Sequence, residues 1–213
     1  LKSCGFLLLI NSNEKLLSID ELIIVISINN NILLFTSKRN SIDMAIKKKE
    51  NEDLFLSKKD DYGTWSPATP VQQLNSRYNE GSAVLSRDGK TIYFGRCDCI
   101  DCYGDCDLFV AKLQPDSTWG EIKNLGTNVN SLSWDSHPSL SHSEDTLFFA
   151  SDRLGGFGLS DIYFTYKRKD GSWAPAQNLG PVVNTRHNDV SPFYHPVFNV
   201  LYFSSNGQLY NFG

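Results

Sequence analysis

The chain repeats itself with a period of 54 to 55 residues, and this repeat limits what it can fold into. Three tryptophans recur 54 residues apart: Trp65, Trp119 and Trp173. Three short apolar segments, TIYFGR, TLFFAS and VLYFSS, start at Thr91, Thr146 and Val200. Because independent landmarks share one spacing, each copy encodes one structural unit.

Each copy predicts four short antiparallel strands. In the second copy, GSAVLS and TIYFGR flank Arg87-Asp88-Gly89-Lys90, a tight turn whose glycine suits a hairpin. DLFVAKL gives a third strand from Asp107, and the segment ending in NLG gives a weaker, edge-like fourth strand. The short apolar runs are rich in Ile, Val, Phe and Tyr, which is typical of strands rather than helices. The predicted fold is therefore an all-β β-propeller of four-stranded blades, with a non-closing β array as the alternative.

The repeat boundaries divide the chain into about three and a half blades. We expect residues 1–20 to be a remnant of a preceding segment or blade, residues 21–74, 75–129 and 130–183 to be blades, and residues 184–213 to be a partial blade. Closed propellers commonly have about four to eight blades. Because the sequence also starts with Leu1 rather than Met, we expect a fragment of a larger ring.

Several segments resemble a known repeat family. SRDGKTIYF, SEDTLFFASDRLGGFGLSDIY, DGSWAPAQNLGPVVNT and SPFYHPVFNVLYFSSNG are similar to the WD-like, Pro-Asp type repeats of the TolB-like superfamily, as in OmpA-family outer-membrane lipoproteins of Bacteroidetes-type bacteria. The resemblance departs from the family pattern at Val197-Phe198-Asn199, which replaces the Asp-Gly turn. It implies a module of the cell envelope, periplasmic or associated with the outer membrane, that binds protein or cell-wall-associated partners without catalysis.

Composition excludes some partners. The chain has 20 Lys and Arg against 24 Asp and Glu, a net charge of −4, and no basic stripe to neutralise phosphates, so we expect no nucleic acid partner. The apolar runs FLLLI and LIIVISI are too short to span a bilayer, so no transmembrane segment is predicted in this sequence. No motif indicates a bound cofactor.

An acidic residue recurs once in each copy, just before the innermost strand: Glu80, Asp135 and Asp189. In a propeller these residues would ring one mouth of the central channel, where they could bind a cation, a polar ligand or a partner. The alternative is that each caps its own loop by accepting hydrogen bonds from backbone N–H groups, as Asp does in turns.

The sequence gives no sign of a catalytic centre. No Gly-x-Ser-x-Gly pentapeptide occurs, and the four histidines show no His-x-x-x-His spacing: His137, His142, His187 and His195. We therefore predict no catalytic residues, no metal site among these groups and a non-enzymatic interaction module. The alternative is the propeller domain of a hydrolase, a serine peptidase or glycosidase, whose catalytic part lies outside this chain.

Four cysteines crowd one loop of the second copy, CDCIDCYGDC. If Phe94 lies opposite Phe109, equal steps toward the loop place Cys97 opposite Cys106, close enough for a disulfide. Cys99 and Cys102 would then join each other or stay reduced. A metal site formed by all four thiolates is the alternative, although four ligands within ten residues strain tetrahedral geometry.

Overall fold

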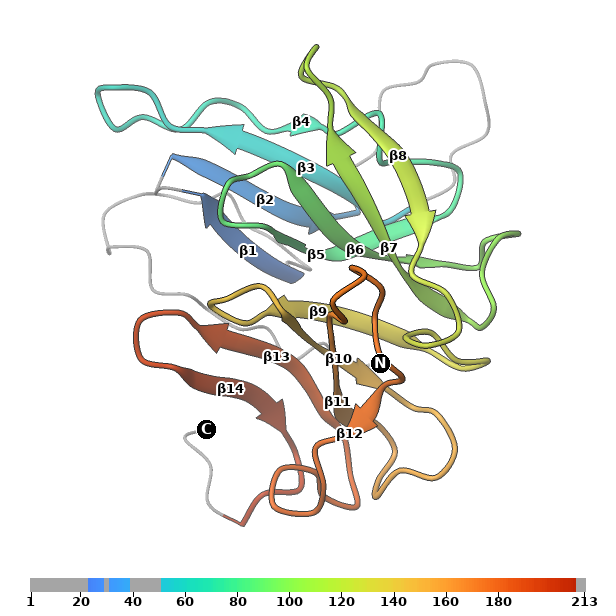
Figure 1. Ribbon diagram of the computed structural model, residues 1–213. Helices are drawn as coiled ribbons and strands as arrows, with labels where there is room; N and C mark the ends of the chain where they lie inside the picture. Colours follow the sequence, from blue (N-terminus) through green and yellow to red (C-terminus); the bar gives the residue numbers. More distant parts are fainter. Residues whose placement is uncertain (1–22, 29–30, 39–50, 210–213) are drawn as a thin grey trace.

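The computed structural model describes residues 23–28, 31–38 and 51–209, and their ordered elements are all β-strands (Figure 1). The predicted remnant at residues 1–20 lies outside the described residues. None of the described residues forms a helix long and apolar enough to cross a membrane.

The strands form four antiparallel sheets in sequence order, which confirms the all-β fold class. The first sheet contains β1 (Ile23–Ile28), β2 (Ile32–Ser37), β3 (Asp53–Lys58) and β4 (Thr69–Pro70). The second contains β5 (Asn79–Leu85), β6 (Thr91–Cys97), β7 (Cys106–Leu113) and β8 (Trp119–Asn124). The third contains β9 (Asp135–Leu140), β10 (Thr146–Ser151), β11 (Asp161–Tyr166) and β12 (Gln177–Asn178). β13 (Asp189–His195) pairs with β14 (Val200–Ser205) as a two-stranded sheet.

Each sheet is a blade in which neighbours in sequence are neighbours in space. The outermost strand is short in the first and third blades, where β4 and β12 have two residues each, as an edge-like fourth strand predicts. Within the described residues the innermost strands β1, β5, β9 and β13 lie side by side, so successive blades are arranged as in part of a propeller (Figure 1).

The hairpin between the first two strands of a blade needs a residue with positive φ, and the three later copies meet this need differently. Gly89 has φ 69° and Glu144, at the matching place, has φ 59°, whereas in the last copy the positive φ of 52° falls one residue later in the turn, on Asn199. Asn tolerates the left-handed region better than most residues. The last copy, which lacks the Asp-Gly signal, closes its hairpin with a different turn, in which the Asn199 N–H donates to His195 O four residues earlier.

A bulge interrupts the innermost strand of the three later blades, two residues after the recurring acid. Ser82, His137 and Ser191 all have positive φ, between 47° and 55°, and the strand pairing shifts at each of them. The bulge turns the edge of the strand toward the preceding blade. There the Ser82 N–H donates to Thr36 Oγ1 at 3.1 Å.

Apolar side chains between successive blades form the core. Between the first two blades, Leu34 and Leu54 pack with Ile92, Phe94 and Phe109. Between the second and third blades the packing continues with the following residues: Tyr93, Leu108, Leu147, Phe149 and Trp173. The blades therefore stabilise one another by burying their facing sides.

Candidate functional site

Loops from adjacent blades interlock at one end of the molecule, which we call the loop end. It comprises residues 72–78, 129–134 and 183–188, which lead into β5, β9 and β13, and residues 98–105 and 152–160, which join the second strand of a blade to the third. The Asp105 N–H donates to Ser133 O at 3.1 Å, and the Leu159 N–H donates to His187 O at 3.0 Å. These bonds tie each loop to the one that begins the next blade.

Recurring polar residues explain how these loops are held. Asn130 Oδ1 accepts the Leu108 N–H at 2.9 Å while its amide donates to Leu108 O at 3.0 Å, and Asn75 and Asn184 make the matching pairs in their own blades. The Asp107 carboxylate accepts the Tyr103 and Gly104 N–H groups. These side chains satisfy backbone groups where the sheet ends.

The recurring acids are also occupied by their own loops. Glu80 is fully buried and accepts the Ser76 N–H at 2.9 Å, the Ser76 hydroxyl, and Arg96 Nε at 2.8 Å. Burial raises the Glu80 pKa, against the hydrogen bonds from Ser76 and the charge of Arg96, which lower it. Arg96 also lies 5.0 Å over the Phe109 ring.

Asp135 and Asp189 take the same position, but only one of them has an arginine. Asp135 accepts the Ser131 N–H and hydroxyl and is paired with Arg153. Asp189 accepts the Thr185 N–H and hydroxyl on Oδ2, whereas its buried Oδ1 has no hydrogen-bond partner in the described part of the chain. The three acids are fully buried, and each caps the loop that precedes it.

Of the four histidines, His137 has the most constrained place. Its Nδ1 accepts the Ser191 N–H at 3.2 Å across the boundary between the third and fourth blades. Burial lowers the His137 pKa to about 4. The imidazole is therefore neutral near pH 7, and it accepts a hydrogen bond from the backbone N–H of Ser191 at the bulge of β13.

The cysteine loop lies at the loop end. The register prediction is confirmed: Phe94 lies opposite Phe109, and Cys97 lies opposite Cys106. The structure joins Cys97 to Cys106 and Cys99 to Cys102 as disulfides. In this arrangement none of the four sulfur atoms is a free thiolate for a metal.

Aromatic and apolar side chains remain exposed at the loop end. Tyr78 is half-buried beside the cysteine loop, and its hydroxyl accepts a hydrogen bond from Arg77 at 2.9 Å, which lowers the Tyr78 pKa. Other apolar residues of these loops are more exposed: Ile100, Tyr103, Leu132, Leu154, Phe157 and Leu159. Three exposed acidic residues lie in the same loops: Asp98, Asp101 and Asp105.

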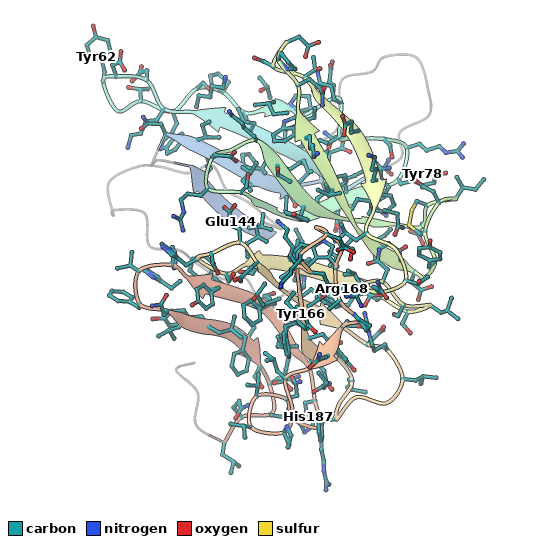
Figure 2. All side chains as sticks on the ribbon, in the orientation of Figure 1. Tyr62, Tyr78, Glu144, Tyr166, Arg168 and His187 are labelled. Carbon is teal, nitrogen blue, oxygen red and sulfur yellow. A yellow bond between two sulfur atoms is a disulfide. The ribbon has the colours of Figure 1, made fainter. Side chains whose placement is uncertain are left out.

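The opposite end, which we call the turn end, consists of the hairpin turns. Figure 2 shows Tyr62 of the β3–β4 turn far from Tyr78 of the loop end. A shallow, open pocket of about 460 Å³ lies here between the turns of the second and third blades. Its lining is polar: Arg87, Asp88, His142, Ser143 and Glu144.

Sequence reasoning missed the arginines. Arg96 lies within β6, whereas Arg153 follows β10 by two residues, so the two do not align in the repeat although both reach the recurring acid. A search for an arginine at or just after the end of the second strand of each copy, as a partner for the recurring acid, would have found both residues. The exposed aromatic residues of the loop end were also missed, because their positions vary between copies.

Comparisons with known proteins support the fold. No family model matches the chain, and no curated protein matches it. A thermostable family-43 glycoside hydrolase of known structure aligns with a TM-score of 0.53 and 12% identity, covering 79% of this chain and 59% of that one. An α-L-arabinofuranosidase from Lactobacillus brevis aligns with a TM-score of 0.54 and 10% identity, covering 83% of this chain and 61% of that one.

A putative TolB from Agrobacterium tumefaciens also aligns, with a TM-score of 0.47 and 18% identity over 79% of this chain and 47% of that one. The envelope-lipoprotein context that the repeat resemblance implies gains no support from a family model. The chain spans less than two thirds of each of these three structures.

One prediction needs correction. The prediction that the chain is not an enzyme is contradicted, since the solved structures that align with it at TM-scores above 0.5 include two glycoside hydrolases. That prediction rested on the absence of a serine-nucleophile motif and of a metal-type histidine spacing. Glycoside hydrolysis uses a pair of carboxyl groups brought together by the fold, and such a pair has no fixed spacing in the sequence.

Proposed function

We propose that this chain is the propeller portion of a glycoside hydrolase and that its loop end binds a carbohydrate chain. The observation that carries the proposal is that loops of the loop end expose the aromatic rings of Tyr103 and Phe157, and in part that of Tyr78, together with exposed carboxylates. Aromatic rings give an apolar face with a defined geometry, and carboxylates accept hydrogen bonds from hydroxyl groups. The propeller shared with glycoside hydrolases supports the same reading.

The catalytic carboxyls belong, on this proposal, to parts of the protein outside the described residues. Glu80 and Asp135 are poor candidates because each is fully buried and paired with an arginine. A general acid or nucleophile must reach the glycosidic oxygen or the anomeric carbon. The role that we assign to the described residues is to bind and orient the substrate.

We place the protein outside the cytoplasm. The disulfides Cys97–Cys106 and Cys99–Cys102 support this location, because disulfides persist in oxidising compartments and are rare in the cytosol. A substrate of polysaccharide type fits the same location.

The proposal is tested by affinity electrophoresis of the chain in gels that contain arabinan, xylan or no polysaccharide. We expect retardation in at least one polysaccharide, and Tyr78→Ala and Tyr103→Ala should each reduce it severalfold. Tyr62→Ala is the matched control, because Tyr62 is an exposed tyrosine of the turn end, 94% accessible. Equal migration in all gels, or equal losses for Tyr62→Ala and Tyr78→Ala, would contradict the proposal.

A further inference from the structure

The two disulfides of the cysteine loop differ in their surroundings. Cys106 is 4% exposed and begins β7, where it pairs with Cys97 of β6 and also bridges to Trp134 of the next blade. The Cys97–Cys106 bond is therefore part of the sheet. Opening it would free two strand ends and disturb the contact between blades.

The Cys99–Cys102 bond closes a turn at the tip of the loop. The two residues between these cysteines project into solvent, with Ile100 87% exposed and Asp101 exposed. Cys99 and Cys102 are themselves partly accessible. Cys99 and Cys102 pack in part against the core, and Cys97 is also partly accessible, so a thiol from outside can approach either bond; only Cys106 is shielded, by the core and the β7 strand. The two bonds therefore differ in that Cys97–Cys106 is held within the sheet, whereas Cys99–Cys102 closes an exposed turn.

The turn does not depend on the Cys99–Cys102 bond. The Cys102 N–H donates to Cys99 O at 3.2 Å, and the Asn124 amide donates to Asp101 O at 3.1 Å. The Asp107 carboxylate holds the next two N–H groups. The corresponding loop of the third blade, residues 152–160, forms without any cysteine. A bond that closes so short a loop also removes less entropy from the unfolded chain than the Cys97–Cys106 bond, which closes a longer one.

We propose that Cys99–Cys102 is a thiol–disulfide exchange site that takes electrons from an external thiol. The spacing is that of the Cys-x-x-Cys motif, in which two cysteines cycle between disulfide and dithiol. Cys97–Cys106 stays closed during the cycle and keeps the loop in place. This activity goes beyond the proposed carbohydrate binding and does not rest on it.

The exchange has two balanced steps. A thiolate attacks one sulfur of Cys99–Cys102, forms a mixed disulfide with it and releases the other cysteine as a thiolate, which takes up a proton. A second external thiolate then attacks the external sulfur of the mixed disulfide, and the external disulfide leaves. The chain gains two electrons and two protons, and two external thiols are oxidised to one disulfide.

The charge around the loop favours one kind of reductant. Asp98, Asp101 and Asp105 lie within the same loop and are exposed. They repel an anionic thiol such as glutathione more than a neutral dithiol such as dithiothreitol, and salt screens this repulsion. We therefore expect the neutral dithiol to react faster at low ionic strength, with a smaller difference at high salt.

Graded reduction with differential alkylation and peptide mass spectrometry tests the site in the unaltered chain. We expect Cys99 and Cys102 to become labelled at a dithiothreitol concentration at least tenfold lower than Cys97 and Cys106. Joint opening of both bonds, prior opening of Cys97–Cys106, or four thiols that hold stoichiometric zinc would overturn the proposal.

Variants separate exchange from folding. The double variant Cys99→Ser/Cys102→Ser should lower the melting temperature less than Cys97→Ser/Cys106→Ser does, and should lose the parent's acceleration of electron transfer from dithiothreitol to glutathione disulfide. Cys97→Ser/Cys106→Ser should lower the melting temperature and keep that acceleration wherever it folds. If the first double variant exchanges as fast as the parent, Cys99–Cys102 is not the site.

Discussion

Replacing Arg96 by methionine tests how the loop end is stabilised. The change removes the cation that reaches Glu80 at 2.8 Å and Leu74 O at 3.1 Å, in a place where Glu80 is fully buried. Removing one partner of a buried ion pair costs about 3–5 kcal/mol. Because Glu80 retains two donors from Ser76, we expect the lower part of this range, roughly 3 kcal/mol of unfolding free energy.

The cost should depend on pH. Burial already raises the Glu80 pKa and Arg96 lowers it, so the variant raises it further. A carboxyl whose folded pKa is raised contributes stability below its unfolded pKa, and this is lost as pH rises through the folded pKa. The loss caused by Arg96→Met should therefore be smaller at pH 5 than at pH 7.5.

Urea unfolding followed by tryptophan fluorescence measures this effect at the two pH values. Lys59→Met is the control, because Lys59 lies 5.4 Å over the partly exposed Trp65 ring and an exposed cation–π contact is worth about 0.5–1 kcal/mol. If Arg96→Met costs no more than Lys59→Met, or costs the same at both pH values, the buried pair does not stabilise the loop end.

Three further predictions concern the other blades. Gln208→Arg should raise the unfolding free energy by about 1–3 kcal/mol, because Gln208 already donates to Val183 O and a guanidinium there would also donate to Asp189 Oδ1, which has no partner among the described residues. An unchanged denaturation midpoint would count against this prediction. Burial, and then the charge of Glu80, raise the Asp53 pKa to about 6, so the wild-type fold loses stability as pH rises through that value. Asp53→Asn should therefore make the unfolding free energy depend less on pH between about pH 4 and 6. The chain should self-associate in light scattering, since β14 pairs only with β13 among the described strands and Tyr202 is 43% exposed; a monodisperse monomer would argue against an accessible edge.

The sequence predicts the blades well because their determinants are local and repeated. Strand runs, the turn at Gly89 and the pairing of Phe94 with Phe109 follow from alternation, turn chemistry and register, and the structure agrees with each. The fold class needs no long-range information, since each copy specifies its own sheet.

The site was harder to predict because its parts come from places that do not align. Arg96 and Arg153 reach equivalent acids from different positions, and the bulge at His137 follows from no residue preference. The prediction that the chain is not an enzyme failed for a related reason. A propeller places its ligand-binding residues on loops that differ in every blade, so the repeat that reveals the fold carries no information about the ligand.

The most direct test of the carbohydrate-binding account is a crystal structure of the chain soaked with an arabino-oligosaccharide. The account predicts density for sugar rings at the loop end, against the ring of Tyr78 or Tyr103. Density confined to the pocket at the turn end beside Arg87 and Glu144, or none at concentrations that saturate binding in solution, would contradict it.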